Sequence, residues 1–158
     1  MNLPKRKSAR LQGYEYSQNG AYFITICTKN KSKLLSDICR GGALLRPLGT
    51  IVALEIESLS SRFNISIDKY VIMPNHIHLI ATVTRAEQSP APTISDIVCA
   101  LKSVTTKIAN EQDNTIGRQI WQRSFHDHVI RNKPSYEKIW QYIDTNPLKW
   151  QDDCFYCE

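Results

Sequence analysis

Segments with strand-like and helix-like patterns follow one another along this chain in an order that few folds accommodate. Aromatic and β-branched residues dominate four short segments and predict strands at 21–28, 66–73, 76–83 and 118–131. Apolar residues recur at helical spacing in three other segments, 48–63, 93–111 and 135–146, and Pro147 stops the last of them. The predicted order is strand, helix, strand, strand, helix, strand, helix.

This order predicts an α+β fold. Its first six elements match the split βαβ pattern of ferredoxin-like (RRM-like) domains, which have a four-stranded antiparallel sheet with helices on one face. The seventh element is an additional C-terminal helix. With 158 residues and no internal repeat, the chain suits a single domain over 1–158, with a basic N-terminal arm at 1–12 and a proline-punctuated loop at 85–92.

Composition excludes several classes of protein. The apolar content of 42% and charged content of 22% are ordinary for a globular domain. No apolar run is long enough to cross a bilayer, and no apolar segment follows the basic N-terminus as it would in a signal peptide, so a cytoplasmic protein is predicted. The five cysteines form no disulfide framework; CFYC at 154–157 is a lone Cys-x-x-Cys, for which reduced thiols are favoured over a zinc knuckle.

The net charge of +5 is unevenly placed. Four cations crowd the N-terminus and three follow the first predicted strand: Lys5, Arg6, Lys7, Arg10, Lys29, Lys31 and Lys33. This distribution favours contacts with phosphates, although a basic surface kept only for solubility remains the alternative.

The four histidines all lie in His-x-His pairs, His76 with His78 and His126 with His128. Residues two apart on a strand project from the same face, so each pair can present two imidazoles together. Neutral imidazoles in this arrangement commonly hold a divalent metal. Hydrogen-bonded histidines beside a turn are the alternative for one isolated pair, but two pairs favour a metal site, which we expect to be solvent accessible at the start of a strand.

The last predicted helix offers partners for such a site. Tyr142 and Asn146 are spaced four residues apart, so they are neighbours on one helix face, together with Lys138. Tyr136 instead lies on the apolar stripe and is interpreted as core. A tyrosine hydroxyl beside an amide oxygen suits a metal site, whereas an amphipathic side chain covering the core is the alternative for Tyr142.

Four separated motifs resemble one known family. RLQGYEYSQNGAYFITICT, MPNHIHLI, WQRSFHDHVIRN and IWQYIDTNPLKW, within residues 10–150, resemble the REP-associated tyrosine transposases. These are single-tyrosine members of the HUH nuclease superfamily, related to small insertion-sequence transposases. The resemblance implies a metal-dependent endonuclease and transposase, which cleaves and rejoins single-stranded or hairpin DNA through a covalent 5′-phosphotyrosine.

The resemblance also implies residue roles. His76 and His78 would bind Mg²⁺ or Mn²⁺, and Tyr142 on the C-terminal helix would be the catalytic nucleophile. The related insertion-sequence enzymes have a glutamine as third metal ligand four residues after the tyrosine, where this chain has Asn146, which carries the same carbonyl oxygen on a shorter stem. Some relatives dimerise and others act alone, so both a monomer and a homodimer are compatible with the sequence.

Further residues are expected to support this chemistry. His126 and His128 lie outside the family's metal motif, so a supporting role through hydrogen bonds or DNA contacts is favoured over a second metal. Arg123, Arg131 and Lys138 are expected to contact DNA together with the N-terminal cations. Two other functions remain open: a nucleic-acid-binding module of the same fold without catalysis, and a metal-dependent phosphodiesterase that activates water.

Overall fold

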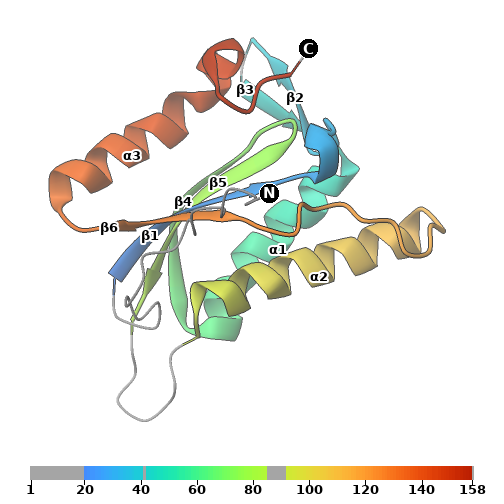
Figure 1. Cartoon of the computed structure of the whole chain (residues 1–158), viewed down its shortest axis with the longest axis horizontal. Helices are drawn as coiled ribbons and strands as arrows, with labels where there is room; N and C mark the ends of the chain where they lie inside the picture. Colours follow the sequence, from blue (N-terminus) through green and yellow to red (C-terminus); the bar gives the residue numbers. More distant parts are fainter. Residues whose placement is uncertain (1–19, 41, 85–91, 158) are drawn as a thin grey trace, which may run out of the picture.

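A four-stranded antiparallel sheet forms the centre of the computed structural model, which describes residues 20–40, 42–84 and 92–157. The strand order is β4-β5-β1-β6, and every neighbouring pair is antiparallel (Figure 1). The strands are β1 (Gly20–Cys27), β4 (Ile65–Ile72), β5 (His76–Val83) and β6 (His126–Ile130). This order and connectivity confirm the predicted ferredoxin-like sheet.

The three α-helices of the described residues divide between the two faces of this sheet (Figure 1). Helices α1 (Pro47–Phe63) and α2 (Ile94–Gln112) pack on one face and enclose the main apolar core. Helix α3 (Lys133–Thr145) lies on the other face, where its Ile143 forms a small cluster with Ile80 and Ile130 of the sheet. Because side chains alternate along a strand, β5 sends Ile77 and Leu79 into the main core and its histidines toward α3.

Local capping explains where two of the helices begin. At the start of α2, Thr93 and Asp96 form a capping box, in which each side chain accepts a hydrogen bond from the other's backbone N–H. At the start of α3, the side chain of Asn132 accepts one from the N–H of Ser135. Helix α3 then passes directly into the 3₁₀ segment η2 (Asn146–Asp152), which turns the chain back toward the sheet.

The predicted strand 118–131 is wrong in its first half. Only His126–Ile130 pairs as a strand, while Trp121 makes an isolated bridge with Thr28. The ammonium of Lys102 on α2 donates hydrogen bonds to the carbonyls of Gln122 and Ser124, at 2.8 and 3.1 Å. These carbonyls therefore accept hydrogen bonds from a lysine of α2. In a longer strand they would instead be available to a neighbouring strand.

Several short elements were not predicted. A two-stranded hairpin of β2 (Ser36–Cys39) and β3 (Gly42–Leu45) precedes α1, and a 3₁₀ turn η1 (Lys29–Lys31) follows β1. The proposed N-terminal arm with Lys5, Arg6, Lys7 and Arg10, and most of the predicted loop 85–92, lie outside the described residues. Among the residues that the structure describes, no helix is both long and apolar enough to pass through a membrane.

Candidate active site

Two histidines at the start of β5 form the centre of the candidate site. His76 and His78 point to the α3 face, and their Nε2 atoms lie 3.0 Å apart. Both side chains are buried, with exposed fractions of 0% and 1%. The rings of Phe155 and Trp150 pack against His76, with centroids 4.7 and 5.9 Å away. The expectation that the pair is solvent accessible is therefore wrong, because the segment after α3 covers it.

The neighbouring Asn75 sets the tautomer of His76. Its Nδ2 donates to the backbone carbonyls of Phe155 and Lys31, at 2.9 and 3.4 Å. Carbonyls can only accept hydrogen bonds, so Oδ1 of Asn75 is the atom that faces His76 Nδ1, at 2.8 Å. His76 therefore carries its proton on Nδ1 and directs the lone pair of Nε2 into the site.

His78 has a more adaptable partner. Its Nδ1 lies 2.8 Å from the hydroxyl of Thr25, the residue opposite it on β1. A hydroxyl can donate or accept, so Thr25 is compatible with either neutral tautomer of His78. In the absence of a cation, the Nε2–H of His78 donates to Nε2 of His76. With Nδ1–H donated to Thr25, both Nε2 lone pairs become available to a ligand.

Burial keeps both imidazoles neutral. It lowers the pKa of His76 to about 4, although the nearby carboxylate of Asp153 acts in the opposite direction. Burial, and then the proximity of His76, lower the pKa of His78 to about 3. Since metal ligation needs the unprotonated ring, the pair is in the metal-binding form at neutral pH.

Helix α3 brings a tyrosine of the same chain to the histidines. The hydroxyl of Tyr142 lies 3.3 Å from Nε2 of His78 and donates to Oδ2 of Asp153, at 3.2 Å. The residue is 40% exposed, so one side of its ring faces solvent. Burial of the remainder, followed by the charge of Asp153, raises the pKa of Tyr142 well above its ordinary value. The side chain is therefore a neutral phenol at neutral pH.

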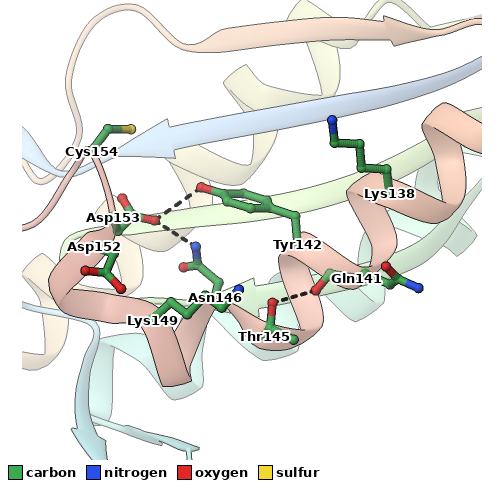
Figure 2. A pocket seen from close by; sticks show the side chains of 9 residues that line it. All are labelled: Lys138, Gln141, Tyr142, Thr145, Asn146, Lys149, Asp152, Asp153 and Cys154. Atoms are coloured by element: carbon green, nitrogen blue, oxygen red, sulfur yellow. Dashed lines mark hydrogen bonds between the residues drawn. The ribbon is translucent and has the colours of Figure 1, made fainter.

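Asp153, at the end of η2, joins the tyrosine to the histidines. Its Oδ2 accepts a hydrogen bond from the amide of Asn146 at 2.7 Å and lies 3.9 Å from Nε2 of His76. Figure 2 shows Tyr142 and Asn146 converging on this carboxylate. Burial opposes its ionisation, but the hydrogen bonds from Asn146 and the N–H of Phe155 outweigh that effect and hold the pKa of Asp153 below its usual range.

The donor set fits a divalent cation. Ligand atoms of His76, His78 and Asp153 all lie within 4.8 Å of one another. Two nitrogens bound at about 2.1 Å with a right angle between them are about 3.0 Å apart, which is the observed separation of the Nε2 atoms. Moreover, Oδ1 of Asn146 is buried without a hydrogen-bond partner among the described residues. An unpaired buried carbonyl oxygen is costly unless a ligand satisfies it.

A cavity of about 620 Å³ opens beside these groups, on the outer side of α3. Tyr142, Asn146 and Asp153 line it, and Lys138 and Lys149 stand at either end of this stretch (Figure 2). Its size falls within the usual range for small-ligand sites. The arrangement therefore places a tyrosine hydroxyl, a cluster that could hold a cation and flanking positive charge around one opening.

Comparison with known proteins identifies the family. The model of the family described as "Transposase IS200 like" matches residues 16–146. The chain belongs to the IS200-like transposase family. A protein of Haemophilus influenzae whose function is uncharacterized is 36% identical, covering 97% of this chain and 94% of that one.

Two further relatives confirm the resemblance to REP-associated tyrosine transposases. The REP-associated tyrosine transposase of Escherichia coli K12 is 24% identical, over 85% of this chain and 70% of that protein. The solved structure of a REP-associated tyrosine transposase bound to a REP hairpin superposes with a TM-score of 0.66 at 22% identity. It covers 89% of this chain and 74% of that one. This IS200-like protein is thus a transposase, and its fold is that of the REP-associated enzyme.

The remaining predicted residues lie at varied distances from the site of this transposase. Lys138 lines the cavity beside Tyr142. His126 pairs with Thr25 of β1, and Thr25 pairs in turn with His78 of β5, so the two histidines lie on the same face of the sheet. The ring centroid of His126 lies 6.4 Å from that of Phe155. His128 follows on the same face, and both are exposed. Neither histidine joins the cation-binding cluster of the described residues. Arg123 and Arg131 flank β6, and both are exposed.

Sequence reasoning missed three residues of the site: Asp153, Thr25 and Asn75. Thr25 could have been found from strand pairing, because it stands opposite His78. Asn75 lies within the quoted MPNHIHLI motif and had no role assigned to it. Asp153 carries no such signal, since it reaches the site only because η2 reverses the chain.

Proposed function

We propose that this transposase is a metal-dependent single-stranded DNA endonuclease and strand transferase that acts through a covalent 5′-phosphotyrosine at Tyr142. The observation that carries the proposal is the position of the Tyr142 hydroxyl. It lies 3.3 Å from His78 and 3.2 Å from Asp153, at the mouth of a cavity. A structural tyrosine at the edge of a core would not need a histidine pair and a buried carboxylate around its hydroxyl.

His76, His78 and Asp153 would hold the cation, with the free Oδ1 of Asn146 as a further ligand. Mg²⁺ or Mn²⁺ bound there would stabilise the negative charge that develops on the phosphodiester oxygens. The protein's own contribution is to keep both histidines neutral and His76 in one tautomer. Asn75 and Thr25 provide this orientation from behind the rings.

Tyr142 supplies the nucleophile. Its phenolic oxygen forms the new bond to phosphorus, and the bond from phosphorus to the 3′ oxygen breaks. The leaving 3′ oxygen takes up a proton from solvent water, so the products are a 5′-phosphotyrosine and a strand ending in a free 3′-OH. Because the linkage retains the phosphodiester bond energy, a 3′-OH can reverse the step and rejoin DNA without a nucleotide cofactor.

Asp153 is the group that receives the phenolic proton. Its pKa is held low and that of Tyr142 is raised, so the hydroxyl stays protonated until its oxygen begins to bond to phosphorus. Oδ2 already accepts this hydrogen in the resting structure. A positioned carboxylate can thus remove the proton as charge leaves the oxygen.

The substrate is proposed to be hairpin DNA. The related structure described above contains a REP hairpin, and Lys138 and Lys149 line the cavity here, where they can contact phosphates next to the scissile one. Since one chain supplies both the tyrosine and the histidines, the proposed reaction needs no partner subunit.

Incubation with labelled hairpin DNA in Mn²⁺ or in EDTA, followed by a denaturing gel, tests the proposal. We expect a protein–DNA adduct with Mn²⁺ and none with EDTA. Cleavage without an adduct would instead support hydrolysis by water, and the absence of both would support a binding module without catalysis.

A further inference from the structure

A second cavity, of about 640 Å³, lies on the opposite side of the sheet from the catalytic one. Helix α2 forms one wall, and the segment that returns from α2 toward β6 forms the other (Figure 1). We call it the α2 groove. Four lysine and arginine residues line it, and the described residues of its lining include no aspartate or glutamate.

Two of the four cations already have protein partners. Lys102 donates to the backbone carbonyls of Gln122 and Ser124 and so holds the second wall against α2. Arg118 pairs with the carboxylate of Asp113. These two shape the groove, and little of their charge is available to a ligand.

The other two cations are Lys107 and Arg123, one on each wall. Both are exposed, and neither forms an ion pair within the described part of the chain. Ser103 lies on the same face of α2 as Lys107, which it precedes by four residues, and Thr106, three residues after Ser103, also lines the groove. The groove therefore presents two positive charges with hydroxyl donors beside one of them, which is the chemistry that binds phosphate oxygens.

The lining favours a duplex backbone over unpaired bases. Sites for single strands use exposed aromatic rings on which bases stack. The one aromatic residue in the described lining, Trp121, is only 7% exposed, and its indole N–H donates to Thr105. Exposed rings lie instead on the other face of the sheet, at Tyr142, His126 and His128.

One wall of the groove continues along the chain into β6. Arg123 lies three residues before His126, where β6 forms the edge of the sheet. We propose that the α2 groove binds the sugar–phosphate backbone of the hairpin stem, while the unpaired strand passes over the β6 edge to Tyr142. This proposal rests on the function proposed above and adds the place where the duplex part of its substrate binds.

Fluorescence anisotropy with two labelled DNAs tests the groove: the hairpin with its unpaired flank, and the flank alone. Lys107→Gln and Arg123→Gln should each weaken hairpin binding by about tenfold at ~0.1 M salt and lower the slope of log Kd against log salt by about 1. Binding of the flank alone should change less than about twofold. Arg40→Gln, which removes an exposed cation outside the groove, is the matched control and should leave hairpin affinity within about twofold.

An unchanged hairpin Kd in the Lys107→Gln/Arg123→Gln double variant would overturn the proposal. Equal weakening of both DNAs, or an equal loss in Arg40→Gln, would overturn it as well, since binding would then be diffuse or not specific to the stem. The adduct assay on the wild-type protein separates this failure from that of the catalytic proposal. If the wild-type protein forms an adduct and the groove variants keep their hairpin affinity, only the groove proposal is overturned. If the groove variants bind the hairpin more weakly and the wild-type protein forms no adduct, only the catalytic proposal is overturned.

Discussion

At the scale of single residues, three polar groups lie around one carboxylate oxygen. Oδ2 of Asp153 is 3.2 Å from the hydroxyl of Tyr142, 2.7 Å from the amide of Asn146 and 3.9 Å from Nε2 of His76. In the proposed mechanism, this oxygen orients the nucleophile, holds the amide and joins the ligands of the cation. Its neighbour Asp152 lines the cavity without such contacts among the described residues.

Asp153→Asn should separate these roles from simple packing, because it keeps the shape and removes the charge. We expect adduct formation to slow by about 10²- to 10⁴-fold, since the phenolic proton loses its acceptor. Affinity for Mn²⁺ should also fall, measured by titration calorimetry. Asp152→Asn is the matched control and should stay within about threefold of wild type; an active Asp153→Asn variant would remove the carboxylate from the mechanism.

Asn146 provides a test of the cation site that does not depend on cleavage. Its Oδ1 is buried and unpaired among the described residues, so Asn146→Ala should weaken Mn²⁺ binding by at least about tenfold. Adduct formation should recover in excess Mn²⁺. Asn146→Gln, which restores a carbonyl oxygen on a longer stem, should be less impaired; equal Mn²⁺ affinity in Asn146→Ala and wild type would show that this oxygen is not a ligand.

Spacing along the chain explains which site residues could be predicted from the sequence. It groups His76 with His78 on a strand and Tyr142 with Asn146 on a helix, but it contains nothing that brings the two pairs together. The family resemblance supplied that link. Asp153 has no periodic relation to either pair, because it follows a reversal of the chain that no short motif signals.

At the scale of elements, close contact between α1 and the loop that precedes β2 depends on one glycine. A Cβ atom on Gly49 would lie 2.0 Å from the backbone oxygen of Leu35, so only glycine fits there. Gly to Ala in a helix ordinarily stabilises by about 1 kcal/mol. Here the backbone must shift, and Gly49→Ala should lower the free energy of unfolding by about 1–3 kcal/mol.

Denaturant unfolding measures this effect, with Thr50→Ala as the control at the next, exposed position of α1. The control should change the free energy of unfolding by about 0.5 kcal/mol or less. A stabilised Gly49→Ala variant would mean that the contact with Leu35 is looser than the structure describes.

A strand could be predicted from the sequence where apolar alternation and regular strand pairing occupy the same residues. At residues 118–125 the apolar pattern is present, but regular strand pairing is absent. Ile120 and Trp121 are buried at 1% and 7% exposure and so resemble a strand in sequence, yet apolar patterning reports burial and not hydrogen bonding. The hairpin of β2 and β3 shows the converse, since its strands of four residues each are too short to carry a pattern.

At the scale of the whole molecule, the buried histidines couple stability to pH. Burial lowers the pKa of His76 to about 4 and of His78 to about 3, whereas both titrate near 6.5 in the unfolded chain. Below pH ~6.5 the unfolded state therefore binds protons that the folded state excludes. The free energy of unfolding of the metal-free protein should fall as pH drops from ~6.5 toward 4, by up to about 1.4 kcal/mol per pH unit for each histidine.

Urea unfolding at a series of pH values in EDTA measures this dependence. His78→Gln removes one of the two groups, so the slope between pH 6.5 and 4 should fall by about half in that variant. A slope unchanged by His78→Gln would show that other groups cause the pH dependence.

The central claim for the molecule is that Tyr142 becomes covalently joined to DNA, and mass spectrometry of the trapped adduct tests it most directly. Wild-type protein and two variants react with hairpin DNA in Mn²⁺ and are then digested with protease and nuclease. We predict that the residual nucleotide phosphate is found on the peptide containing Tyr142. Tyr136→Phe, whose hydroxyl donates instead to Asp68, should keep the adduct, and Tyr142→Phe should form none. An adduct in Tyr142→Phe, or a modified peptide that lacks Tyr142, would contradict the account.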